Sequence, residues 1–172
     1  MEVSRAIKER RSVRKFKSED FSEETLTLLL EAASLAPSAG NVQPWKFYII
    51  RDKKFKEKLG NAALGQRWMT SAPVIIVVCA DLERSALAYG ERGYKLYALQ
   101  DTAAAIQNIL LSAVEQGLSS CWVGAFREEM AADLLDLDID KLRPVALVPI
   151  GYPAESPLYP PKRPLKEIVE YK

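Results

Sequence analysis

Apolar and polar residues recur along this chain with two periods, one typical of helices and one typical of buried strands. Between Leu26 and Ala33 the apolar residues are three and four positions apart. This spacing predicts an amphipathic helix with Ser22 as its N-cap and Pro37 beyond its end. The stretch from Tyr94 to Gln116 has the same period and a wider apolar stripe. We expect that long helix to lie in the core or against a partner.

Short apolar runs separate the helices. The run from Pro73 to Ala80 consists largely of β-branched residues and predicts a strand buried on both faces. Further strands are expected at residues 45–50, 119–125 and 144–152, further helices at 1–10, 53–59 and 128–135, and a polar connection at 82–93. The first helix would use Val3, Ile7 and Ala6 as its apolar stripe. This order predicts an α+β or mixed α/β fold, a few strands covered by helices, in one domain over residues 1–172.

The C-terminal segment from Pro153 to Lys172 contains five prolines, which exclude an ordinary helix along that length. We expect residues 153–172 to form an extended arm that carries a short apolar segment from Leu165 to Val169. Because the preceding elements already form a complete domain, the arm is best explained by wrapping a second subunit.

Composition narrows the function. Basic and acidic residues number 24 and 23, so no overall field attracts a nucleic acid or a membrane. No apolar run approaches the ~20 residues of a membrane-spanning helix, and the N-terminal residues do not form a signal peptide. Cys79 and Cys121 lie in apolar runs and are expected to be free, buried thiols in a reducing compartment. We therefore expect a cytoplasmic protein.

The chain has no histidine. This absence removes catalysis by Ser-His-Asp or Cys-His arrangements, together with the usual zinc sites. An enzyme of this composition would use carboxylates, or a cofactor that carries the difficult chemistry.

Seven basic residues and one acid lie between Arg5 and Lys17, in a chain that is otherwise balanced. Guanidinium groups bind phosphate through paired hydrogen bonds, and the hydroxyl of Ser12 would add a donor. The alternative is a solvated charged helix face. Nucleic-acid binding is a weaker alternative, because Phe16 is the only interleaved aromatic residue and no second basic patch extends the run.

A polar loop, Pro37-Ser-Ala-Gly-Asn-Val-Gln-Pro44, follows the amphipathic helix. Its prolines stiffen the loop, its glycine lets the backbone approach a ligand, and its amide side chains both donate and accept. The alternative is a plain surface turn from helix to strand.

Together, Arg10-Arg-Ser-Val-Arg-Lys-Phe16 and the loop that continues into Trp45 resemble the nitroreductase family of FMN enzymes. Further matching features are Ala72-Pro73 before a strand, the long helix, Trp122-Val-Gly124 and Pro149-Ile-Gly-Tyr-Pro153. The resemblance implies a central, mostly antiparallel sheet flanked by helices, and a homodimer with two FMN molecules at the subunit interface. It also implies NADH or NADPH as co-substrate.

Carried over residue by residue, the resemblance implies a phosphate and ribityl site made by Arg10, Arg11 and Ser12. Arg14 would lie beside N1 and O2 of the flavin, where a fixed positive charge stabilises the negative charge that develops during reduction. Lys162 and Arg163 would return to the phosphate, and Gln66 would face the pyrimidine edge.

The other side of the ring is implied to be lined from the second subunit by Pro37, Ser38, Ala39 and Asn41. Backbone N–H groups near Gly124 and Ala125 would approach flavin N5. The family's lysine is replaced by Arg14, and only residues 82–93 are available as a lid, which predicts an open and permissive pocket.

The main expectation is therefore an FMN-dependent NAD(P)H oxidoreductase that reduces a nitroaromatic, a quinone or a similar electron-poor acceptor. Two alternatives remain open within the resemblance. One is related flavin chemistry, such as reductive dehalogenation, flavin fragmentation or oxidation of peptide-derived rings. The other is a dimer that holds flavin without catalysis.

Overall fold

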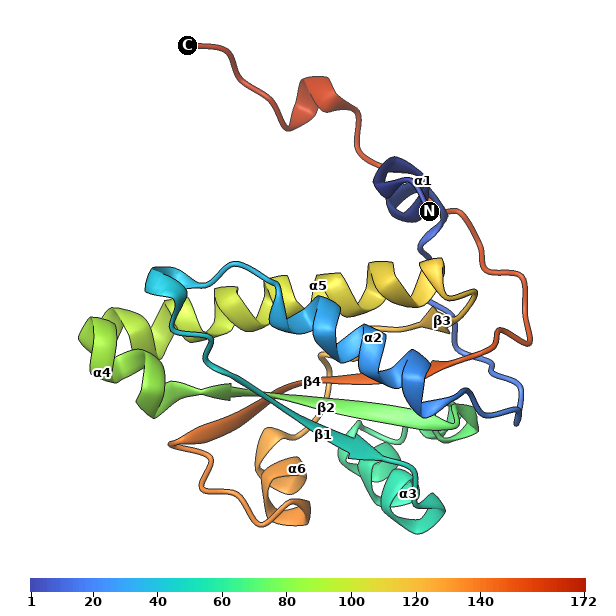
Figure 1. The fold of residues 1–172 in the computed structure, drawn as a ribbon, viewed down its shortest axis with the longest axis horizontal. Helices are drawn as coiled ribbons and strands as arrows, with labels where there is room; N and C mark the ends of the chain where they lie inside the picture. The colour runs from blue at the N-terminus through green and yellow to red at the C-terminus, as the bar shows by residue number, and fades with distance from the viewer.

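The computed structural model describes residues 1–172, and its centre is a sheet of four strands in the order β1-β2-β4-β3 (Figure 1). The strands are β1 (Trp45–Ile50), β2 (Val74–Asp81), β3 (Ser119–Ser120) and β4 (Leu142–Gly151). Every neighbouring pair is antiparallel. The predicted α+β class is confirmed.

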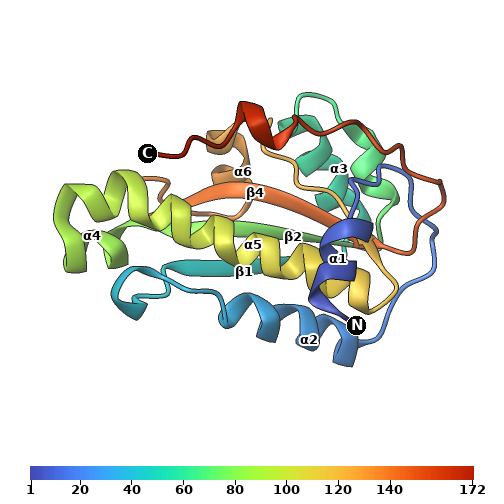
Figure 2. The same ribbon diagram turned by 90° about the horizontal axis from the view of Figure 1, so that it is seen from above.

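The remaining regular elements are helices and single turns. They are α1 (Val3–Glu9), α2 (Glu23–Ser34), η1 (Ala39–Asn41), α3 (Lys53–Ala62), η2 (Arg67–Ser71), α4 (Leu82–Arg92), η3 (Gly93–Tyr97), α5 (Ala98–Glu115), α6 (Glu128–Leu134) and η4 (Leu165–Glu167). Helices α2 and α5 cover one face of the sheet, and α3 and α6 cover the other (Figures 1 and 2).

Strand β2 joins the two halves of the core because its side chains alternate between the faces. Val74, Ile76 and Val78 pack with α2 and α5, whereas Ile75 and Val77 pack with residues of α3 and α6. All five side chains are fully buried, and each contributes about 1.5–3 kcal/mol on transfer from water. The predicted strand with two buried faces is thus confirmed.

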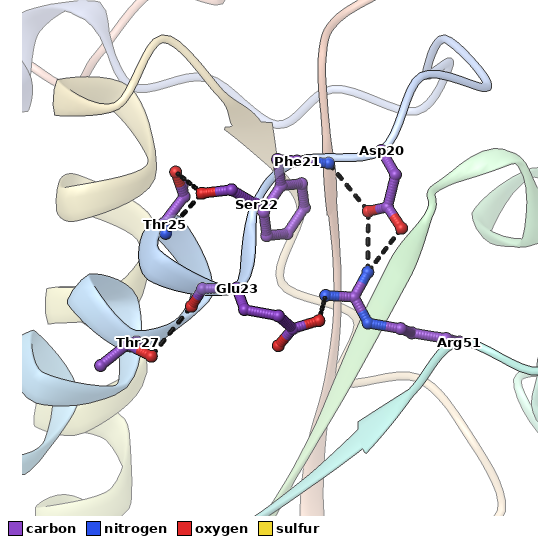
Figure 3. Close-up of polar contacts among 7 residues, drawn as sticks. All are labelled: Asp20, Phe21, Ser22, Glu23, Thr25, Thr27 and Arg51. Carbon is purple, nitrogen blue, oxygen red and sulfur yellow. Dashed lines mark hydrogen bonds and ion pairs between the residues drawn. The ribbon is translucent and has the colours of Figure 1, made fainter.

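The start of α2 is fixed by side-chain contacts (Figure 3). The hydroxyl of Ser22 accepts a hydrogen bond from the N–H of Thr25 at 3.2 Å, which confirms Ser22 as the N-cap. Arg51, which follows β1, donates to both carboxylate oxygens of Asp20 and also to Glu23. These contacts tie the first turn of α2 to the end of β1.

The polar connection expected at residues 82–93 is wrong, because these residues form helix α4 up to Arg92, with a break at Gly90, whose φ of 58° is not helical. Its N-cap is Asp81, whose carboxylate accepts from the N–H of Arg84 at 2.9 Å. Only Leu82 and Ser85 of this helix are buried. An apolar stripe of that size leaves too weak a periodic signal for prediction.

The strand expected at 119–125 is also too long, since β3 ends at Ser120. Cys121 donates its N–H to the carbonyl of Pro149 at 3.2 Å, but proline has no N–H to return the second bond of that pair. The chain touches β4 once more, through the bridge between Val123 and Leu147.

Helix α1 buries only part of the predicted stripe. Val3 and Ile7 are 70% and 56% exposed, and only Ala6 is buried against the rest of the chain. The arm is extended apart from η4, as its prolines predict, and it continues from the end of β4 away from the sheet (Figure 1). Its apolar residues, including Leu165 and Ile168, are exposed. That the arm reaches a second subunit stays a prediction.

Lys56 gives a test of the packing between α3 and the start of β2. Its buried Nζ donates to the carbonyls of Ala72 and Pro73 at 2.7 and 3.1 Å. Burial lowers the pKa of this ammonium group, while Asp20 and Asp52 partly oppose the shift. The unfolded chain therefore binds more protons than the folded chain between the lowered pKa and the ordinary one.

We expect wild-type stability to rise relative to that of Lys56→Met as the pH increases from about 8 to about 10. Chemical denaturation across this range measures the difference, and Lys54→Met, an exposed change on the same helix, is the control. A difference that stays constant or shrinks with pH would contradict the assignment.

Candidate functional site

The basic residues of the N-terminal segment line a cavity of about 570 Å³. Arg10, Arg11, Ser12, Arg14 and Lys162 all contribute to its wall. The rest of the wall comes from the start of the arm, residues 155–160. Five of the predicted site residues therefore meet in one place, which we call the cationic cavity.

The edge of the sheet holds this segment in place. Ser12 bridges to Ser120, and the N–H of Val13 donates to the carbonyl of Ser120 at 3.1 Å. Val13 and Phe16 are buried and pack with Ala72. With these apolar side chains turned inward, the arginines between and before them face the cavity.

Four cations line the cavity, and none of them forms an ion pair with a carboxylate: they are Arg10, Arg11, Arg14 and Lys162. The guanidinium of Arg11 stacks over the ring of Tyr159 at 3.8 Å, and that of Arg14 lies 5.9 Å from the ring of Trp68. Unpaired guanidinium groups with a hydroxyl beside them form a strong donor set for a phosphate.

One acid opposes these charges. The carboxylate of Glu155 accepts a hydrogen bond from the backbone N–H of Arg14 at 2.6 Å and lines the same cavity. Arg163 lies outside the cavity wall, where it pairs with Glu167 at 3.5 Å.

A second group of predicted residues lies between η2 and the segment after β3. The side-chain amide of Gln66 donates to the carbonyl of Ala125 at 3.0 Å, which brings Gln66 together with Gly124 and Ala125. Gly124 and Ala125 are exposed, so their backbone is accessible to a ligand. Trp68 follows Gln66 by two residues, and its ring lies 5.9 Å from the guanidinium of Arg14, so this second group lies close to Arg14.

The loop from Pro37 to Pro44 lies elsewhere. The N–H of Ala39 points at the carboxylate of Asp101, with 3.2 Å to each oxygen. Asp101 lies in the first turns of α5, whereas α1 meets the other end of that helix, where the Met1 amine contacts Glu115 at 2.6 Å. Figures 1 and 2 show η1 and α1 at opposite ends of α5.

The fourteen residue steps from Asp101 to Glu115 span about 21 Å of helix. The 37–44 loop and helix α1, which leads into the basic segment of the cationic cavity, therefore lie at opposite ends of α5.

Neither cysteine is available as a nucleophile. Both thiols are buried and free, as predicted. Burial raises the pKa of Cys79 to about 12 and also raises that of Cys121, against the opposing effects of Arg14 and Ser12. Both thiols are therefore neutral at ordinary pH.

Three residues at these sites escaped the sequence analysis: Glu155 and Tyr159 in the cavity wall, and Asp101 behind the loop. The first two depend on how the arm turns back toward Arg11, which no local pattern predicts. Asp101 did leave a signal, because it is the only acid between Glu91 and Glu115.

The fold and the cationic cavity define an α+β protein with a ready anion site. A model of the Nitroreductase family matches residues 7–66 and 62–152. The chain belongs to the nitroreductase family, as its motifs indicated.

Individual proteins agree with this membership. An NADH dehydrogenase of Thermus thermophilus is 32% identical to this chain, in an alignment that covers 98% of this chain and 95% of that protein. The FMN reductase (NAD(P)H) of Bacillus subtilis is 28% identical over 179 residues, covering 97% and 72%. A protein of Exiguobacterium sibiricum, solved in complex with FMN, has a TM-score of 0.90 at 22% identity, covering 100% and 98%; this likeness shows the shared fold. No helix of the chain is both long and apolar enough to cross a bilayer.

Glu155 gives a test of the cavity's charge balance. Its carboxylate disfavours a bound anion and occupies the N–H of Arg14. We expect Glu155→Gln to bind inorganic phosphate a few-fold more tightly, an effect of about 1 kcal/mol at a solvated site. Isothermal titration at low salt measures the change, with Glu170→Gln, an exposed acid elsewhere on the arm, as control. Weaker phosphate binding by Glu155→Gln would contradict this role.

Proposed function

We propose that this chain is an FMN-dependent NAD(P)H oxidoreductase that works as a homodimer. In this proposal, each FMN is held by the cationic cavity of one subunit and by the 37–44 loop of the other. The observation that carries the proposal is the convergence of four unpaired cations and the Ser12 hydroxyl on one cavity.

The residues present fit such a ligand. The volume of about 570 Å³ lies within the usual range for small-molecule sites. Arg10, Arg11 and Ser12 would hold the phosphate and ribityl chain, with Lys162 as a further cation. Arg163, now paired with Glu167, would join them only by a shift of the arm. The names of the relatives, which refer to FMN, NADH and NAD(P)H, support this cofactor assignment.

FMN, when bound, supplies hydride transfer from a reduced nicotinamide to an acceptor. The chain's own residues would bind the cofactor and favour negative charge at its N1–O2 edge. Arg14 suits this role because a guanidinium carries a delocalised positive charge and several N–H donors in a rigid plane. Backbone N–H groups at Gly124 and Ala125 would face N5, with Gln66 beside them holding the Ala125 carbonyl.

The proton that accompanies each hydride to the acceptor would come from water, so no side chain has to supply it; this fits a chain without histidine and with two neutral thiols. The acceptor in this proposal is a nitroaromatic, a quinone or a similar electron-poor compound. Helix α4, whose outer face is exposed, would act as a short lid over an open pocket.

The partner subunit would contribute Pro37, Ser38, Ala39 and Asn41 to the ring. The extended arm, residues 153–172, and the exposed face of α1 supply apolar surface for the dimer. We further propose that residues 1–172 act as one domain, and that the protein works in the cytoplasm, where its two buried thiols stay reduced.

The visible spectrum tests this function. Apoprotein titrated with FMN should bind one FMN per chain, and the bound flavin should bleach when NADH or NADPH is added without oxygen. The colour should return on addition of a quinone or a nitroaromatic. Protein that binds no FMN, or binds it stoichiometrically without bleaching under either nicotinamide, would overturn the proposal.

A change at Arg14 gives a second prediction, for the affinity and the reduction potential of the bound flavin. We expect Arg14→Ala to weaken FMN binding and to lower the reduction potential of the bound flavin by about 30–60 mV. This range corresponds to the loss of one charged hydrogen bond of about 1.5–3 kcal/mol. Arg14→Lys keeps the charge and serves as the control. An unchanged potential in Arg14→Ala, measured by dye-coupled reduction, would remove Arg14 from the ring edge.

A further inference from the structure

The loop that the proposed function places on the flavin has a strained backbone. Gly40, Asn41 and Gln43 all have positive φ angles, of 54°, 57° and 54°. Side chains other than glycine adopt this left-handed region at a cost, so Asn41 and Gln43 persist there only if their surroundings hold them. The loop therefore depends on anchors. Bonds within the loop hold Gln43, whose N–H donates to the Ser38 hydroxyl at 2.9 Å and whose side-chain amide donates to the Asn41 side-chain oxygen at 3.1 Å.

Three contacts from neighbouring helices then hold the loop against the rest of the chain. The N–H of Ala39 donates to Asp101 on α5, and Arg84 on α4 donates to the carbonyl of Val42 at 2.6 Å. The hydroxyl of Tyr89, also on α4, lies so close to Gly40 that a Cβ there would meet it at 2.2 Å. Asp101 differs from the other two anchors because it is buried.

Asp101 is 7% exposed, and the Ala39 N–H is the only hydrogen-bond donor that reaches its carboxylate. A buried carboxylate with one backbone partner is expensive for the fold. In agreement, burial raises the pKa of Asp101, and the bond from Ala39 only partly opposes the shift. An apolar residue would suit this stripe of α5 better, so stability alone does not explain Asp101.

We propose that Asp101 is a positioning residue that fixes the 37–44 loop for the flavin held by the partner subunit. The inference rests on the proposed function and extends it to a residue that does not itself touch the cofactor. By holding the Ala39 N–H, Asp101 would fix the backbone next to Ser38 and Asn41, which are both at least partly exposed.

The first experiment compares FMN dissociation constants of apoproteins, measured by quenching of flavin fluorescence. Asp101→Ala should bind FMN about tenfold to a hundredfold more weakly, the usual loss for a hydrogen bond to a charged group. Asp101→Asn should lie between this variant and wild type, because its amide oxygen still accepts from Ala39. Thr102→Val, a buried neighbour that bonds only within α5, should bind within about twofold of wild type.

Thermal unfolding of the same apoproteins separates positioning from general stability. Since the buried carboxylate is costly, Asp101→Ala should melt no lower than Thr102→Val, although it binds FMN more weakly. A loss of FMN affinity that simply follows a fall in melting temperature across the three variants would overturn the proposal.

A mixed dimer shows which of the two flavin sites is affected by the change at Asp101. One chain carries Asp101→Ala and the other Arg10→Ala, each with its own affinity tag. If Asp101 serves the partner's flavin, both defects fall on one site and the other site keeps near wild-type affinity. If Asp101 serves its own subunit's cavity, each site has one defect and no tight site remains, which would overturn the proposal.

The outcomes also distinguish a failure of the proposed function from a failure of the role proposed for Asp101. Wild-type protein that binds no FMN overturns the proposed function. Wild-type protein and Asp101→Ala that bind FMN equally tightly overturn only the role of Asp101. If Asp101→Ala fails to fold, the Asp101→Asn comparison and its mixed dimer with Arg10→Ala decide the question in the same way.

Discussion

Helix α5 is a rigid spacer, and the rest of the account depends on its length. Its N-terminal turns hold the 37–44 loop through Asp101, and its C-terminal end meets α1 through Glu115, about 21 Å away. An α-helix in a packed core does not shorten. The 37–44 loop and the segment that follows α1 therefore lie at opposite ends of α5, and this separation is the reason why the proposed flavin site takes its two halves from two copies of the chain.

The cationic cavity also depends on backbone that the rest of the fold holds in place. Its donors lie on a short segment that pairs with Ser120 at the sheet edge and is pinned by the buried Val13 and Phe16. The chain holds its positive charges on backbone that the sheet already orders, so little freedom is lost when an anion binds. Glu155, at the start of the arm, offsets part of that charge, so the arm contributes an acid as well as Lys162 to the cavity wall.

Much of this could be predicted from the sequence where signals are local and strong. The β-branched run of β2 and the Ser22 cap of α2 appear as expected, and the first basic motif lines a cavity as its composition suggested. Helix α4 was missed because it buries little, and the end of β3 was missed because it depends on Pro149 in another strand. The contacts of Glu155 and Asp101 arise from tertiary packing. The family resemblance assigned the basic motif and the 37–44 loop to one flavin site. Only the structure shows that the two lie at opposite ends of α5.

Native mass spectrometry of the FMN-saturated protein shows whether the flavin site is shared between two subunits, because it reports ligand occupancy for each oligomeric state. Each chain has a mass of 19.2 kDa. The account predicts that FMN resides on dimers, two per dimer, and that monomers produced by dilution carry none. Monomers that retain one FMN each, at the occupancy found in dimers, would contradict a site shared between two subunits.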